Sequence, residues 1–119
     1  MTDLISTLLE PYIDAPVECD GFTRIAHSVL AGAGITHTCM AGRLVSTSLN
    51  AELPLHFWIQ LDDGRLIDYR ARLWLGDDAA VPHGVFAAGQ YPDWSYQGAE
   101  LNLPVFSATM IKVLAHQMV

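Results

Sequence analysis

Basic residues are scarce in this chain. It carries six lysines and arginines against 13 aspartates and glutamates, which gives a formal net charge of −7 over 119 residues. A protein that binds nucleic acid needs a positive surface to neutralise phosphates. The composition therefore argues against nucleic acid as a partner.

Long apolar runs are also missing. No run approaches the roughly 18 consecutive apolar residues that a membrane-spanning helix requires. The first residues, MTDLISTLLEPYIDAP, are acidic where a secretory signal peptide would be basic. We therefore expect no membrane association and a cytoplasmic location.

Cysteine is limited to Cys19 and Cys39. In a reducing cytosol we expect two free thiols rather than a disulfide. His27 lies outside the best apolar positions of its helix, so we expect it on the surface or at a rim. No Cys/His pair has the spacing of a zinc signature, so we expect His37, in a strand, and His83, in a turn, to have no metal-binding partner. The sequence predicts no metal and no cofactor.

The apolar residues that are present show clear periodicity. They make up 51% of the chain, enough for one compact domain over residues 1–119. Alternation between helical and strand-like periods predicts an α+β fold. The expected elements are a short helix over 2–10, a helix from Cys19 ended by Gly34, a strand over 35–46, a hairpin over 55–72, short elements within 75–90, a strand or hairpin within 91–103, and a helix over 106–118.

The stretch PLHFWIQLDDGRLIDYRARLW, residues 54–74, predicts a hairpin that turns at Asp62-Asp63-Gly64. A three-residue loop places Trp58 opposite Asp68, with Asp68 diagonal to His56 at roughly 7 to 8 Å. Only this odd loop separates an apolar face from a polar one. The apolar face holds Phe57, Ile59, Leu61, Ile67, Tyr69 and Ala71, and the other holds His56, Trp58, Gln60, Leu66, Asp68 and Arg70.

Cys19 is the candidate nucleophile. A helix N-terminus favours the thiolate, a neighbouring histidine takes the proton, and a carboxylate on the other ring nitrogen fixes the histidine tautomer. Cys19, His56 and Asp68 supply these three groups, so we predict a catalytic triad. Other interpretations stay open, because free cysteines are commonly buried apolar residues and a His and an Asp on a hairpin are commonly just solvated. Cys39 is expected to be such a buried thiol.

The runs CDGFTRIAHSVLAGAGI, AGRLV and LHFWIQLDDGRLIDYR resemble the transglutaminase-like core of the papain-like cysteine enzyme superfamily. The resemblance covers residues 18–72 and implies an α+β fold, in which a helix with the cysteine at its N-terminus packs on an antiparallel sheet. It implies Cys19 as nucleophile, His56 as general base and acid, and Asp68 as the orienting residue. This chain differs in having Glu18 and Asp20 beside the cysteine, and these carboxylates oppose thiolate formation.

These observations predict a thiol-dependent acyl-transfer enzyme acting on amide bonds of a peptide or protein substrate. A cysteine peptidase or amidase is expected first and a transglutaminase second, with the backbone N–H of Cys19 as an oxyanion donor. We expect Trp58 either to bind substrate or to pack the hairpin, and Trp74 to pack. The alternative is a non-catalytic acidic module on the same fold that binds a basic protein surface, such as a phage or plasmid inhibitor of a host protein. The sequence does not indicate an oligomeric state.

Overall fold

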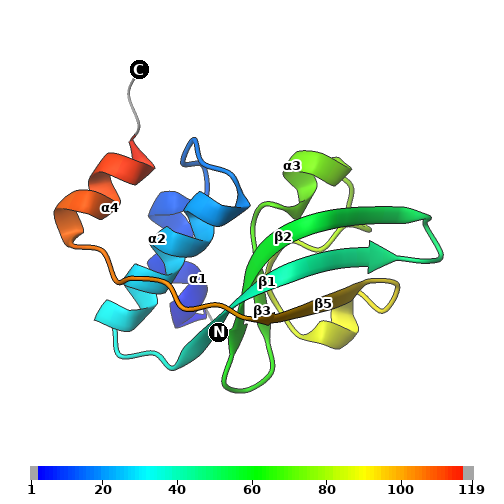
Figure 1. Cartoon of the computed structure of the whole chain (residues 1–119), viewed down its shortest axis with the longest axis horizontal. Coiled ribbons are helices and arrows are strands. Elements are labelled where there is room, and N and C mark those ends of the chain that lie inside the picture. Colours follow the sequence, from blue (N-terminus) through cyan, green and yellow to red (C-terminus); the bar gives the residue numbers. More distant parts are fainter. Residues whose placement is uncertain (1–2, 117–119) are drawn as a thin grey trace.

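Residues 3–116 form an antiparallel five-stranded sheet and a group of helices, which confirms the α+β class (Figure 1). The computed structural model describes residues 3–116. The strand order in the sheet is β4-β3-β2-β1-β5. The helices are α1 (Leu4–Leu9), α2 (Cys19–Gly32), α3 (Ala71–Leu75) and α4 (Ala108–Ala115), with single turns of 3-10 helix at Glu10–Tyr12 and Ala88–Gln90; the strands are β1 (His37–Ser46), β2 (Ala51–Leu61), β3 (Leu66–Asp68), β4 (Gly84–Phe86) and β5 (Ser95–Glu100).

Helix α2 is the central helix, and its boundaries agree with the sequence prediction. Its apolar stripe is buried against α1 and one face of the sheet, as helical periodicity predicts. Gly34, with φ of +73°, ends the helix in the left-handed conformation that glycine adopts at low cost. Figure 1 shows α1, α2 and α4 grouped on one side, and β1, β2 and β5 extending away from them. No helix within residues 3–116 is long and apolar enough to cross a bilayer.

The β2–β3 hairpin has the predicted three-residue loop. The backbone N–H of Leu61 donates to the carbonyl oxygen of Arg65 at 2.8 Å, and Ile59 lies opposite Ile67. Gly64 takes a φ of +89°, which a type I turn followed by a left-handed residue requires. Counting along this register puts Trp58 opposite Asp68, as expected.

The returning strand is shorter than predicted. It ends at Asp68 instead of continuing to about residue 72. The carboxylate of Asp68 accepts hydrogen bonds from the backbone N–H groups of Arg70 and Ala71, at 3.0 and 3.1 Å. This side-chain turn competes with strand pairing and leads the backbone into α3.

The second face of the hairpin is buried, not solvated. Trp58 and Leu66 form a cluster with Phe86, against which Met40, Tyr91 and Tyr96 pack. Of the predicted polar face, Gln60 remains exposed. A Cβ atom on Gly98 would collide with the backbone of β1 and with the Trp58 ring, so this glycine permits the close approach of β5. The sheet therefore has a covered face on both sides near His56.

Candidate active site

His56 and Asp68 form a buried pair. The Nε2 atom of His56 lies 2.6 Å from Oδ2 of Asp68, and their side chains are 0% and 1% exposed. The hairpin register places these residues on one face and diagonal to each other, so side chains of this length close the remaining distance. The sequence prediction that they meet is confirmed.

The carboxylate of Asp68 is held by four donors. Oδ2 accepts from His56 and from the hydroxyl of Tyr96, the latter at 2.8 Å, while Oδ1 accepts from the backbone N–H groups of Arg70 and Ala71. A buried carboxylate needs such donors to offset its desolvation. Because an ionised carboxylate only accepts, Nε2 of His56 carries a proton. The other ring nitrogen, Nδ1, is left for chemistry.

Cys19 is the first residue of α2 and is partly exposed. No side chain caps this helix end, so its first backbone N–H groups keep their hydrogen-bonding capacity. The Cys19 thiol influences the pKa of the His56 ring. Burial lowers the pKa of His56, but hydrogen bonding and charge from Asp68 and Cys19 outweigh burial and raise that pKa to about 9.

The second ring nitrogen of His56 is not used by Asp68. Nδ1 is buried and has no hydrogen-bond partner among residues 3–116. Since Nε2 is bound to Asp68, Nδ1 is the ring nitrogen available to Cys19, whose thiol is close enough to raise the pKa of His56. Nucleophile and base commonly approach loosely in the absence of substrate and tighten when it binds.

Arg70 fastens the segment that leads into Cys19. Its Nε donates to the carbonyl oxygen of Val17 at 2.7 Å, and Nη2 donates to that of Ala15 at 3.1 Å. The guanidinium lies 4.5 Å from the centre of the Phe22 ring and the residue is 6% exposed. The prediction that Arg70 continues the polar strand face is wrong, because β3 has already ended. Its side chain turns to the helix side and holds the backbone of the residues before Cys19.

Cys19 opens onto a pocket of about 440 Å³. Apolar side chains form most of its wall, and two carboxylates lie beside the thiol. Trp74 is 59% exposed here, although packing was the role expected for it. The lining residues are Glu18, Cys19, Asp20, Leu53, Pro54, Leu55, Phe57 and Trp74. A substrate in this pocket would meet Cys19, while His56 stays covered.

Trp58 lies behind the site. It is 2% exposed, with its ring 6.2 Å from that of His56 at an interplanar angle of 24°. It packs edge-on against Tyr96 at 5.0 Å and faces a second pocket, which Met40 and Tyr91 also line. The structure thus shows a packing role for Trp58, and its contact with substrate stays a prediction.

Tyr96 is a site residue that the sequence reasoning missed. It lies on β5, 28 positions after Asp68, and no local motif links the two residues. Burial, reinforced by the charge of Asp68, raises the pKa of Tyr96, so its hydroxyl remains a donor. The β strand predicted within residues 91–103 was the available signal, but its position beside β1 comes from long-range pairing.

The remaining histidines and the second cysteine lie elsewhere. Cys39 is buried in β1 as predicted, and burial raises the pKa of its thiol to about 11. His27 is partly buried, which agrees with a rim position, and it contacts His37, a contact that the sequence did not predict. The reason is that β1 begins directly beside α2 and brings His37 to it.

No protein-family model, no curated protein and no solved structure matches this chain. The resemblance to the transglutaminase-like core therefore stays a prediction.

Proposed function

We propose that this protein is a thiol-dependent acyl-transfer enzyme acting on amide bonds, with a transglutaminase-like, papain-like core. Cys19 is the nucleophile, His56 the general base and acid, and Asp68 the orienting carboxylate. The observation that carries the proposal is the His56 ring: one nitrogen is bound to a buried carboxylate, and the other is unpartnered and acts toward a cysteine at a helix N-terminus.

In the acylation step, Nδ1 of His56 takes the proton of the Cys19 thiol, the sulfur attacks the amide carbonyl carbon, and the carbonyl π electrons move onto oxygen. The backbone N–H groups at the start of α2 are placed to stabilise this oxyanion. When the intermediate collapses, the C–N bond breaks and Nδ1 of His56 gives its proton to the leaving amine. A thioester on Cys19 and a free amine result.

In the deacylation step, water or an amine attacks the thioester carbon and gives a proton to Nδ1 of His56. Collapse breaks the C–S bond, and the proton returns to sulfur as the acid or new amide leaves. Throughout, Asp68 holds the tautomer and stabilises the imidazolium. We place hydrolysis first, as peptidase or amidase activity, and transfer to an amine second.

The side chains that line the pocket favour a substrate with both apolar and basic groups. Leu55, Phe57 and Trp74 offer apolar contact, while Glu18 and Asp20 place negative charge next to Cys19. An apolar residue followed or preceded by a basic one matches this surface. The same carboxylates would repel an acidic substrate.

A peptidyl chloromethyl ketone with an apolar and a basic residue tests the proposal without knowledge of the natural substrate. We expect it to alkylate Cys19 at neutral pH at least about 100-fold faster than Cys39, because only a thiolate is a strong nucleophile. Mass spectrometry of tryptic peptides would measure both rates. An amidase assay on the matching peptide amide would follow, with and without an added primary amine.

The controls are Cys39→Ala, which should leave modification of Cys19 unchanged, and His56→Gln, which should slow it strongly. Circular dichroism would show that each variant is folded. Equal, slow labelling of both cysteines that His56→Gln leaves unaltered would contradict the enzyme and favour a non-catalytic binding module.

A further inference from the structure

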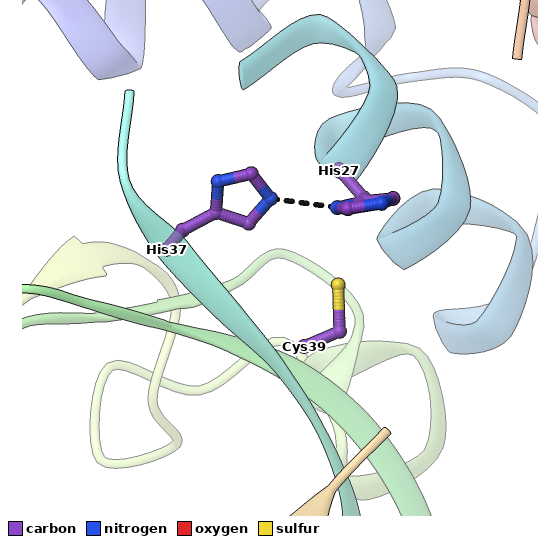
Figure 2. Close-up of side chains that lie close together, drawn as sticks. All are labelled: His27, His37 and Cys39. Atoms are coloured by element: carbon purple, nitrogen blue, oxygen red, sulfur yellow. Dashed lines mark hydrogen bonds between the residues drawn. The ribbon is translucent and has the colours of Figure 1, made fainter. Parts of the chain in front are cut away.

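A second group of ligand-type side chains lies between α2 and β1. His27 comes from α2, and His37 and Cys39 come from the first residues of β1, where alternate positions share a face. One ligand atom from each residue lies within 4.8 Å of the others. Figure 2 shows the two imidazole rings meeting and the sulfur of Cys39 directed toward them.

The outer hydrogen bonds fix the tautomers of both histidines. Nε2 of His27 lies 2.9 Å from the carbonyl oxygen of Leu103, and Nδ1 of His37 lies 2.7 Å from that of Ile35. A carbonyl oxygen only accepts, so each of these nitrogens carries a proton. In the neutral rings, the other nitrogens are therefore both acceptors.

Those two acceptor nitrogens face each other. Nδ1 of His27 and Nε2 of His37 are 2.7 Å apart, the dashed line in Figure 2. Two lone pairs at this distance repel, and the repulsion is removed by a shared proton or by a metal ion that both nitrogens bind after the rings move slightly apart. Within residues 3–116 the cluster includes no carboxylate that would stabilise an imidazolium, whereas the sulfur of Cys39 adds a third ligand-type atom beside the two nitrogens.

We propose that Nδ1 of His27, Nε2 of His37 and Sγ of Cys39 bind a transition-metal ion of the Zn²⁺ type. Two imidazole nitrogens and one thiolate suit an ion of borderline softness. The backbone carbonyls on the outer N–H groups are the usual second partners of metal-bound histidine. Tetrahedral Zn²⁺ holds two such nitrogens roughly 3.3 Å apart, so the rings separate by about 0.6 Å on binding. Water takes the fourth position.

The position of the cluster suggests what the ion does. It joins α2 to β1, and the segment after β5 closes over it through Leu103. Close by, the backbone N–H of Phe106 donates to the hydroxyl of Ser28 at 2.8 Å. A metal ion here would fasten the helix, the sheet and this segment together. His27 lies about 12 Å along the helix axis from Cys19, so the ion is separate from the proposed catalytic thiol.

Metal titration of the full chain tests the site. After chelator treatment under reducing conditions, we expect calorimetry to show one Zn²⁺ per chain, with affinity that rises with pH because Cys39 must lose its proton. Co²⁺ should give the strong visible absorption of tetrahedral coordination and a thiolate-to-metal band in the near ultraviolet. Absence of binding, or one Co²⁺ bound without the thiolate band, would overturn the proposal.

Substitutions assign the ligands. His37→Gln and Cys39→Ala should each weaken Zn²⁺ binding by more than the roughly 10- to 100-fold that loss of an outer partner costs. Cys19→Ser and His83→Gln should leave it unchanged, and circular dichroism would verify folding. Binding that survives both ligand substitutions, or that Cys19→Ser abolishes, would show that the ion is bound elsewhere.

Discussion

Two histidine and cysteine groups lie along the same helix, and they differ in one component. At the start of α2, His56 has a carboxylate on one ring nitrogen and a thiol near the other. Eight residues further along α2, His27 faces a second histidine, with Cys39 beside them. The first group contains an acid and the second does not.

This difference decides the charge of each ring. Burial lowers the pKa of both His56 and His27, but Asp68 and Cys19 more than compensate at His56, and no acid does so at His27. The first ring therefore keeps a proton that it can pass to a leaving group. The second ring offers a lone pair, which suits a metal ion. One helix can thus carry a proton-transfer site and a metal-type site.

Asp68→Asn removes the component that distinguishes the two groups, and we expect the largest effect from it. Without the carboxylate, burial keeps His56 neutral and its tautomer is no longer fixed. Modification of Cys19 by the peptidyl ketone should slow on the order of 10³-fold. The measurement is the second-order rate constant at pH 7.

Asp63→Asn is the matched control, because Asp63 is an exposed carboxylate in the β2–β3 turn. It should leave the rate constant unchanged. If circular dichroism shows that the Asp68→Asn variant is folded, and its Cys19 still reacts as fast as in the parent protein, Asp68 has no orienting role.

The two groups should respond to pH with opposite sign. His56 has a pKa of about 9, raised from 6.5, so its contribution to stability is complete below about 6.5 and is lost as pH rises through about 9. Acyl transfer should fall about tenfold per pH unit above 9, because the general acid is lost. The pKa of His27 is lowered from 6.5, so the contribution of His27 to stability is complete above about 6.5 and is lost as pH falls through the lowered pKa.

NMR titration of the histidine ring protons in the metal-free protein measures both directions. We expect the midpoint of His56 near 9 and that of His27 below its ordinary value, with His56→Gln and His27→Gln used for assignment. Identical midpoints for the two rings would show that the carboxylate does not distinguish them.

Tyr96→Phe should change the reaction rate of Cys19 less than Asp68→Asn or a change of pH does. It removes one of four donors to Asp68, and a hydrogen bond to a charged group contributes about 1.5 to 3 kcal/mol. We expect urea denaturation to show a loss near the lower end of that range, and Cys19 to react a few-fold more slowly. Because Tyr96 positions Asp68 and not the thiol, the pH profile should shift as well. Tyr91→Phe, which changes a neighbouring tyrosine, should alter neither the rate nor the profile.

Local sequence patterns were sufficient where neighbours along the chain supply the constraint. The apolar period and Gly34 predicted α2, because helix faces and C-terminal caps are set within a few residues. The DDG turn predicted an odd loop, and that register alone brought His56 and Asp68 together. Cys19 at a helix start was predicted for the same reason.

Contacts between side chains from distant segments were decided only by the tertiary structure. The sequence predicted that β3 continues past Asp68, because polar and apolar residues go on alternating there. The strand ends at Asp68 because its side chain accepts hydrogen bonds from the next backbone N–H groups. Tyr96 reaches Asp68, and Arg70 reaches the residues before Cys19, through strand pairing and loop packing that no local period encodes. His27 and His37 meet for the same reason. The sequence thus determined the helix, the hairpin and the pairing of His56 with Asp68, whose geometry is local, while burial, the donors around Asp68 and the second histidine group follow from contacts that exist only when the sheet and helices are assembled.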